Sequence, residues 1–246
     1  MQLVVVDQIA TLTMSNPKGN AINPSFLATL EGLINALEAS TANACIITGQ
    51  GRFFSVGLDL PLLGRLPRAE LRDFMRDFSR VMTNLFATTI PLVAAINGHA
   101  IAGGCVIAQQ ADIRIMADGP YQIGLKEAQI GIGLPIVVTE TLRAFLPSGA
   151  LVDVAYRGKL FSPEDALSIG LIEQTIRSDQ LMEKSLAVAE DFGKTSAAIR
   201  QIKWAVRQPI IDRIRRHEAA SLEQWLDTWF NPESQQLIAE IVQTIR

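Results

Sequence analysis

Residues 92–104 read Leu-Val-Ala-Ala-Ile-Asn-Gly-His-Ala-Ile-Ala-Gly-Gly, and this stretch decides the fold class. Its first five residues, 92–96, form a continuous apolar run, which is typical of a buried strand. The glycine-rich turn 97–104 follows, and we expect an apolar helix from there to Gln110 and another strand over 113–116. A strand that leads through such a turn into a helix and then into a new strand predicts an α/β core.

The same alternation extends toward the N-terminus. Residues 3–6 and 9–14 are β-rich runs that predict a hairpin, and the buried strand expected over 44–48 ends at a glycine pair. Asn23-Pro24 predicts the start of a helix, since Asn suits the N-cap and Pro the first helical position. A loop through Asp59 is expected to lead to a second helix over 68–86.

Beyond residue 181 the pattern becomes purely helical. Four helices are expected, separated in part by Pro209 and Asn231-Pro232, over residues 181–192, 196–206, 211–230 and 234–245. We therefore divide the chain near residue 185 into an α/β body, 1–185, and a helical region, 186–246. The aromatic side chains of the latter, Trp204, Trp225, Trp229 and Phe230, suggest a packing or oligomer surface.

The composition excludes several classes of protein. The 246 residues carry a net charge of -3, which argues against nucleic acid as the main partner. Two His and no zinc-type Cys/His spacing argue against a transition-metal site. Cys45 and Cys105 each lie in an apolar run, so we expect free buried thiols.

No membrane partner or secretion signal is expected. The uncharged stretch 81–111 is interrupted by Pro91, polar residues and glycines, so it reads as core rather than as a membrane span. The N-terminus lacks a basic leader and a small-residue cleavage site. We therefore expect a cytoplasmic protein.

Two loops offer backbone amides for chemistry. The turn 98–104 opens a helix, and the loop 52–60 follows the preceding buried strand. Glycines in the turn serve either close backbone packing or unobstructed N–H groups at the positive end of a helix. Two such loops from neighbouring strands can present two amides to one oxygen, as enolate stabilisation requires. Asp59 in the second loop is better explained as a local backbone acceptor than as a catalytic group.

Glu127 is the candidate general base. It is the single acid between Gly119 and Thr139, and apolar surroundings would raise its pKa. The alternative is an exposed turn carboxylate paired with Lys126, and this segment by itself leaves both open. A hydrolase using Ser55 and His99 is disfavoured because the chain has no Gly-x-Ser-x-Gly elbow.

Six motifs in one order resemble the enoyl-CoA hydratase/isomerase (crotonase) family along nearly the whole chain. They are Asn20-Ala-Ile-Asn-Pro24, Ile46-Ile-Thr-Gly49, Gly51-Arg-Phe-Phe-Ser-Val-Gly-Leu-Asp59, Ile96-Asn-Gly-His-Ala-Ile-Ala-Gly-Gly104, Ala111-Asp112-Ile-Arg114, and Leu160-Phe-Ser-Pro-Glu-Asp-Ala166 with Gly170-Leu-Ile-Glu173. The resemblance implies a spiral of ββα units with a C-terminal helical trimerisation region, usually in homotrimers or hexamers. It also implies an acyl-CoA thioester substrate and no separate cofactor, because CoA is part of the substrate.

The resemblance also assigns roles to residues. By motif position, the amides of Leu58 and Gly103 form an oxyanion hole for the thioester oxygen, worth roughly 3 to 4 kcal/mol per donor in related sites. Family hydratases use two glutamates, whose positions here hold Val106 and Glu127. Valine cannot hydrogen-bond the water that hydration needs, whereas moving a double bond needs one base.

The amino-acid sequences of residues 54–60 and 123–131 resemble those of the mitochondrial-type Δ3,Δ2-enoyl-CoA isomerases of the family. The resemblance thus implies conversion of 3-enoyl-CoA to trans-2-enoyl-CoA, with Glu127 as the shuttling base. The alternatives are a hydratase with a non-standard second acid such as Glu140, or a non-catalytic acyl-CoA-binding protein.

Substrate contacts are also implied by the resemblance. Val56 and Leu60 flank Leu58 in the loop that touches CoA, and Val106 and Pro135 are further candidate substrate contacts. The apolar residues 136–138, which follow Pro135, fit a wall for the acyl chain. Where many members carry a phosphate-binding Lys, this chain has Pro61. The candidates for phosphate contact are Lys18, Arg52, Arg65 and the Arg200/Lys203/Arg207 stripe, although a solvated helix face explains that stripe better.

Overall fold

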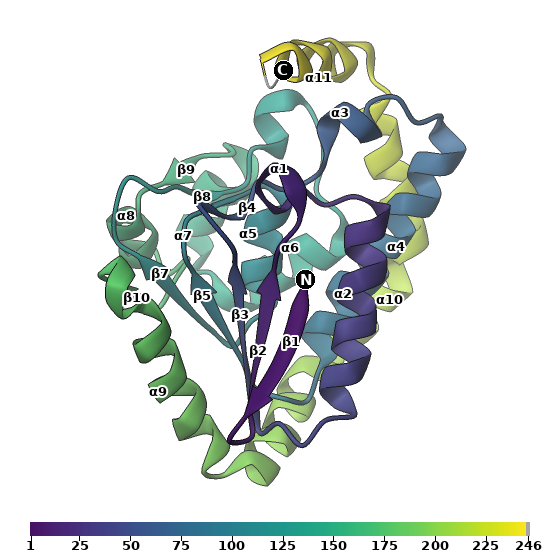
Figure 1. Cartoon of the computed structure of the whole chain (residues 1–246). Coiled ribbons are helices and arrows are strands. Elements are labelled where there is room, and N and C mark those ends of the chain that lie inside the picture. The colour runs from purple at the N-terminus through teal and green to yellow at the C-terminus, as the bar shows by residue number, and fades with distance from the viewer. Residues whose placement is uncertain (245–246) are drawn as a thin grey trace.

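Two sheets and a set of covering helices make up the computed structural model, which describes residues 1–244 (Figure 1). Within that range one sheet has the strand order β1-β2-β3-β5-β7-β10 and the other β4-β6-β8-β9. The strands of the first are β1 Gln2–Val6, β2 Ile9–Met14, β3 Ala44–Gly49, β5 Leu92–Ile96, β7 Ile113–Ala117 and β10 Gln174–Ile176. Those of the second are β4 Phe53–Ser55, β6 His99–Ile101, β8 Ile123–Gly124 and β9 Leu160–Phe161.

The helices follow the strands in a repeating order. The longer ones are α2 Pro24–Glu38, α4 Arg68–Ala87, α6 Ile136–Phe145, α9 Leu181–Gly193, α10 Ser196–Trp229 and α11 Pro232–Thr244. The shorter ones are α1 Pro17–Asn20, α3 Leu60–Leu63, α5 Gly103–Gln109, η1 Glu127–Ile130, α7 Ser148–Leu151, η2 Val152–Tyr156, α8 Pro163–Ser168 and η3 Ser178–Gln180. The chain forms three successive strand pairs, β3/β4, β5/β6 and β7/β8. In each pair the first strand belongs to the larger sheet and the second to the smaller one, and a helical segment follows. This is the predicted spiral of ββα units.

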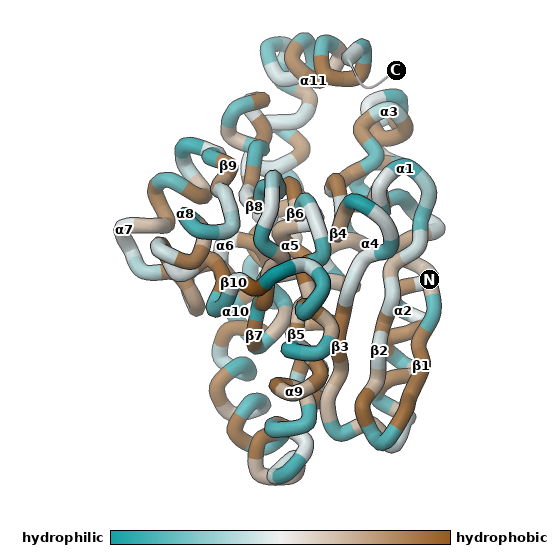
Figure 2. The backbone as a smooth tube through the Cα atoms, turned by 60° about the vertical axis from the view of Figure 1, so that its left-hand side comes forward, coloured by the Kyte–Doolittle hydropathy of each residue, from teal (hydrophilic) through white to brown (hydrophobic). Residues whose placement is uncertain are grey.

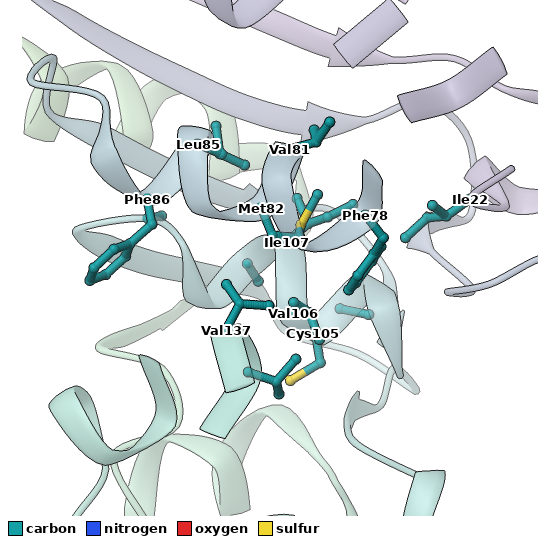
Figure 3. Close-up of a cluster of buried hydrophobic side chains, with 14 of the residues drawn as sticks. Ile22, Phe78, Val81, Met82, Leu85, Phe86, Cys105, Val106, Ile107 and Val137 are labelled. Atoms are coloured by element: carbon teal, nitrogen blue, oxygen red, sulfur yellow. The ribbon is translucent and has the colours of Figure 1, made fainter. Parts of the chain in front are cut away.

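Both faces of the larger sheet are buried at its central strands β3, β5 and β7, which explains the continuous apolar runs there. In β5, Val93 and Ala95 belong to a small core under α9, whereas Leu92, Ala94 and Ile96 face the main core. The main core lies between the sheet, α2, α4 and α5. Figure 3 shows α4 side chains against those of α5 and α6; labelled are Phe78, Val81, Met82, Leu85, Phe86, Cys105, Val106, Ile107 and Val137.

Local signals in the N-terminal half predicted the elements correctly. The hairpin, the strand at 44–48 and the helix at 68–86 are present, and the Asn23 side chain accepts a hydrogen bond from the Phe26 amide at 2.9 Å. Cys45 and Cys105 are free and buried, as predicted. The segments 52–60 and 97–104, which were expected to be loops, each contain a three-residue strand, β4 and β6. These strands were not predicted because so short a strand shows no periodicity in the sequence.

The prediction of two helices separated at Pro209 was wrong, because α10 is continuous from Ser196 to Trp229. Pro209 lies on the exposed side, so the carbonyl that loses its intrahelical partner can be hydrated. The opposite side is buried both before and after the proline, at Arg207 and at Ile210. Packing along this side therefore keeps the helix continuous.

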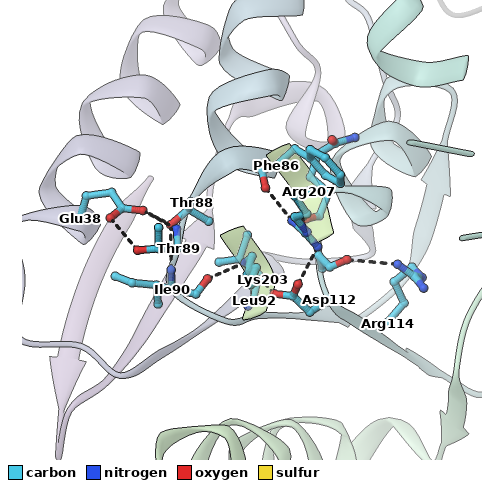
Figure 4. A network of polar contacts seen from close by, with 12 residues as sticks. Glu38, Phe86, Thr88, Thr89, Ile90, Leu92, Asp112, Arg114, Lys203 and Arg207 are labelled. Atoms are coloured by element: carbon cyan, nitrogen blue, oxygen red, sulfur yellow. Dashed lines mark hydrogen bonds and ion pairs between the residues drawn. The ribbon is translucent and has the colours of Figure 1, made fainter. Parts of the chain in front are cut away.

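The basic stripe on α10 is not solvated, contrary to the preferred interpretation. Lys203 donates to Asp112 Oδ2 and to the Ile90 carbonyl, both at 2.7 Å. Arg207 donates to Asp112 Oδ1 at 2.6 Å and to the Phe86 carbonyl at 2.7 Å, in the network shown in Figure 4. Spacing reveals a stripe but not the side on which it packs. These two cations fasten α10 to the sheet and are unavailable to phosphate.

The two ends of the helical region lie far apart. In both views, α11 lies beside α3 at one end of the molecule and α9 extends toward the other (Figures 1 and 2). The predicted boundary at residue 185 falls inside α9, which packs on β3 and β5. Ile245, the last residue of the predicted final helix, lies outside the described residues. Among helices of residues 1–244, none has the length and apolar character needed to cross a membrane.

Candidate active site

The two predicted amide-bearing loops meet. Gly57 has φ +87°, and a Cβ placed there would lie 2.9 Å from the Gly103 nitrogen and 2.8 Å from the Ile101 carbonyl oxygen. A side chain at this position would therefore force the loops apart, and the left-handed backbone conformation independently favours glycine. A Cβ at Gly103 would in turn lie 3.6 Å from the Leu58 nitrogen. The predicted pair of amides is thus side by side.

The segment around Asn20 holds the first loop in place. Asn20 donates to the carbonyls of Phe53 and Phe54, each at 3.1 Å. The Ser55 hydroxyl donates to the Asn20 carbonyl at 2.8 Å and accepts from the Gly57 amide at 3.1 Å. These bonds occupy Ser55, so it serves the backbone of the loop.

The amides of Leu58 and Gly103 are available to a ligand. A parallel bridge to Ile22 uses the Gly57 carbonyl and the Asp59 amide, and so leaves the Leu58 N–H between them free. Among residues 1–244, neither the Leu58 nor the Gly103 N–H donates to another backbone group. Ala102, at the start of α5, has φ 50°, a strained value for a residue with a side chain. Strain of this kind is typical of functional sites, and here it immediately precedes a free amide.

Glu127 lies at the start of η1, three residues after β8. The Ala102 amide donates to the Gly124 carbonyl at 2.8 Å, which ties the Glu127 segment to the Gly103 turn. Glu127 as a whole is partly exposed, but its carboxylate oxygen Oε2 is buried and has no hydrogen-bond partner among residues 1–244. Burial raises the pKa of this carboxyl to about 7, opposed by hydrogen bonds from the Glu127 and Lys126 amides. An enclosed carboxylate with this pKa can accept or return a proton near neutrality.

These groups line one cavity of about 360 Å³. Its inner wall is apolar and buried, formed by Met75, Phe78, Val106, Val138, Trp225 and Trp229. Its outer part includes the more exposed Val56, Leu58, Leu60, Lys126, Ile241 and Thr244. Glu127 is the one carboxylic acid among the lining residues of the described chain. The cavity therefore combines one base, two free amides and an apolar interior.

All seven residues predicted for the site line this cavity: Val56, Leu58, Leu60, Gly103, Val106, Glu127 and Pro135. Other candidates lie elsewhere. Asp59 caps α3 by accepting from the Leu62 amide at 3.2 Å, as predicted for a local backbone acceptor. His99 accepts from the Gln122 amide at 3.1 Å, so it is not paired with Ser55.

Glu140, the candidate second acid, does not line the cavity. It is buried on α6, where it pairs with Arg143 at 3.0 Å and Arg213 at 2.7 Å. Both carboxylate oxygens are therefore occupied by cations. This arrangement leaves the position of Val106 without an acidic substitute.

Sequence reasoning missed what α10 and α11 give to the site. Trp225 and Trp229 line the cavity, their ring centroids 5.1 Å apart. Three hydroxyls fix the loop after Glu127: Ser221 accepts from the Ile136 amide, Thr228 accepts from the Gly133 amide, and Ser234 donates to the Gly131 carbonyl, each at 2.9 Å. The four-residue spacing of the two tryptophans indicated a shared helix face, but not the partner of that face.

A search for groups of three or more His, Cys, Asp or Glu side chains that could hold a metal ion finds none within residues 1–244.

Comparison with known proteins gives a consistent class. The sequence model of the enoyl-CoA hydratase/isomerase family matches residues 6–238. Enoyl-CoA delta isomerase 1, mitochondrial, of Homo sapiens is 30% identical over 223 residues, covering 89% of this chain and 74% of that protein. A probable enoyl-CoA hydratase of Bacillus subtilis is 29% identical over 197 residues, covering 78% and 76%. The chain belongs to the enoyl-CoA hydratase/isomerase family.

A solved structure agrees with the fold. The crystal structure of human mitochondrial delta3-delta2-enoyl-CoA isomerase superposes with a TM-score of 0.92 at 27% identity, covering 100% of this chain and 98% of that one. The fold is therefore of the crotonase type, with sheets followed by a C-terminal helical region. Relatives named as isomerases and as hydratases have nearly the same identity to this chain, so identity does not separate the two reactions.

Proposed function

We propose that this protein is a Δ3,Δ2-enoyl-CoA isomerase, which converts 3-enoyl-CoA to trans-2-enoyl-CoA. The observation that carries the proposal is the lone Glu127 carboxylate in an apolar cavity that has Val106 at the second acid position. One base is enough to move a proton along an allylic system. Hydration, in contrast, needs a water held and activated by a second polar group.

The reaction follows from the groups around the cavity. Glu127 removes a proton from C2, and the electron pair moves toward the thioester oxygen to give a dienolate. The amides of Leu58 and Gly103 stabilise that oxygen, where the negative charge develops. Glu127 then returns the proton to C4, so that the double bond moves from C3 to C2 without change in composition. A carboxyl with a pKa of about 7 suits both steps.

The proposal includes the acyl-CoA thioester as substrate, with no separate cofactor. It also includes a homotrimer or hexamer assembled through the helical region 186–246. Three apolar side chains exposed on α10 support a contact surface there: Ile202, Trp204 and Val206 are 56%, 56% and 63% exposed. The mass of the protein in solution, measured by light scattering, tests the assembly.

The reaction is tested by giving the purified protein a 3-enoyl-CoA and, separately, a trans-2-enoyl-CoA. The proposal predicts conjugated-thioester absorbance from the first and little 3-hydroxyacyl-CoA from the second. Fast hydration without isomerisation would overturn it and assign the hydratase reaction. Tight binding of both thioesters with no conversion of either would make the protein a non-catalytic binder.

A further inference from the structure

The interior of the cavity contains a wall that the proposed reaction does not explain. Besides Val106, five of its lining side chains are between 1% and 3% exposed: Met75, Phe78, Val138, Trp225 and Trp229. They come from three helices, α4, α6 and α10, and carry no charge. Lining residues near the mouth, such as Leu60 and Lys126, are more exposed. The cavity thus has a more exposed end, which includes the charged Lys126, and a closed apolar end.

Tryptophans dominate the closed end. Trp225 and Trp229 lie one turn apart on α10, with ring centroids 5.1 Å apart and ring planes inclined by 30°. Helix α10 packs along α4 and α6 and is fixed to the sheet through Lys203 and Arg207. The Gln235 side chain of α11 also donates to the Trp229 carbonyl at 2.7 Å. This wall is anchored on several sides, and densely packed interiors resist displacement.

The positions of the reacting groups give the acyl chain a direction. The Leu58 and Gly103 amides fix the thioester oxygen, and CoA, which is large and charged, must remain at the open end. The acyl chain then points past Glu127 toward the closed end. We propose that the Trp225–Trp229 pair is the stop that limits acyl chain length in this protein. The proposal rests on the acyl-CoA part of the proposed function and adds a specificity determinant to it.

Binding of saturated acyl-CoA thioesters tests the stop without relying on turnover. Calorimetry with chains from four to sixteen carbons should show affinity rising about fourfold per methylene while the chain fills the apolar interior. Once the chain reaches the wall, the next methylenes should lower affinity by about tenfold or more. A steady rise through sixteen carbons would overturn the proposal.

Two variants should move this limit in opposite directions. Trp229→Leu removes part of the wall and should shift the limit to chains at least two carbons longer. Val138→Leu adds a methylene to the cavity lining and should shift it to shorter chains, and it remains informative if the first variant fails to fold. Tyr156→Leu is the control, because Tyr156 is an aromatic residue that is 71% exposed and does not line the cavity.

The outcomes separate this inference from the isomerase assignment. An unchanged limit in the folded Trp229→Leu or Val138→Leu variant would overturn the stop and leave the reaction intact. A limit that moves as expected in a protein that converts no 3-enoyl-CoA would support the stop and overturn the isomerase. Absence of binding at every chain length would overturn both.

Discussion

Glu127 and Asp112 both direct a carboxylate toward the interior, but the two carboxylates differ in their hydrogen-bond partners. Asp112 accepts charged hydrogen bonds from Lys203 and Arg207, as well as one from the Leu92 amide at 2.7 Å. Among residues 1–244, Glu127 forms no ion pair, and its Oε2 has no hydrogen-bond partner. Asp112 joins elements distant in sequence, whereas Glu127 lines a cavity.

The contrast distinguishes an acid with a structural role from an acid that is a candidate for catalysis. A fully paired carboxylate holds its charge and its position, and removing it leaves its partners uncompensated. An unpaired, desolvated carboxylate has a raised pKa and can exchange a proton with a ligand. Glu140 belongs to the first kind, since two arginines occupy its oxygens. Partners, rather than burial alone, therefore identify the candidate base.

The largest effect is expected from removing the unpaired acid. Glu127→Gln keeps the shape of the side chain but abolishes the base, so kcat/KM for 3-enoyl-CoA should fall by about 10²- to 10⁴-fold. The rate of appearance of the conjugated thioester measures it. Glu164→Gln, on the exposed face of α8, is the control and should retain wild-type activity. A loss of less than threefold in Glu127→Gln would remove this residue from the proposed role.

Removing the paired acid should instead reduce stability. Asp112→Ala leaves Lys203 and Arg207 buried without their counter-ion, which should lower the free energy of unfolding by about 3–5 kcal/mol. Urea denaturation measures the change. Asp191→Ala, which breaks an exposed pair with Lys194, should cost about 0–1 kcal/mol. Equal small losses in both variants would contradict the structural role of the network.

Neutralising Glu127 should also stabilise the fold, and only at high pH. Its pKa is raised in the folded state from 4.5 to about 7, so the folded protein binds the proton more tightly than the unfolded chain. The contribution of this group to wild-type stability is therefore fully present below pH 4.5 and is lost as the pH rises through about 7. Relative to wild type, the free energy of unfolding of Glu127→Gln should thus rise by about 3 kcal/mol as the pH increases from 4.5 to 8. Parallel stability curves for the two proteins would contradict the raised pKa.

The smallest effect concerns the loop behind the base. Thr228→Val leaves the Gly133 amide without its acceptor and should loosen the segment that follows Glu127. We expect kcat to fall about tenfold with KM little changed, since one unsatisfied amide costs about 1–3 kcal/mol. Thr228→Ser retains the hydroxyl and should restore kcat. A rise in KM with unchanged kcat, or failure of Ser to rescue, would show that Thr228 does not position the base.

Much of the fold was predictable because its signals are local. The strand at 92–96, the Asn23 cap and the glycine-rich turn each depend on neighbouring residues, and the structure contains all three. The predicted helix break at Pro209 was wrong because a proline on the exposed side of a well-packed helix is tolerated, and exposure is a tertiary property. The prediction that the basic stripe of α10 is solvated was wrong for the same reason.

The site was predictable only where sequence motifs carry it. The Gly57 and Gly103 loops and Glu127 could be located in this way, and the structure brings them to one cavity. Trp229 and Thr228 could not, because they lie about a hundred residues further along and their helix faces several surfaces at once. Whether a buried acid is paired is likewise decided by distant residues, which no local pattern reveals.

The most direct test of the unpaired base is the pH dependence of kcat/KM for isomerisation of a 3-enoyl-CoA. The base must be deprotonated to react, so kcat/KM should fall tenfold per pH unit below about 7 and level off above it. An inflection near 4.5, the ordinary range of a glutamate, would contradict the account. A flat profile from pH 5 to 8 would do the same, since it would mean that Glu127 is already ionised throughout or takes no part in the reaction.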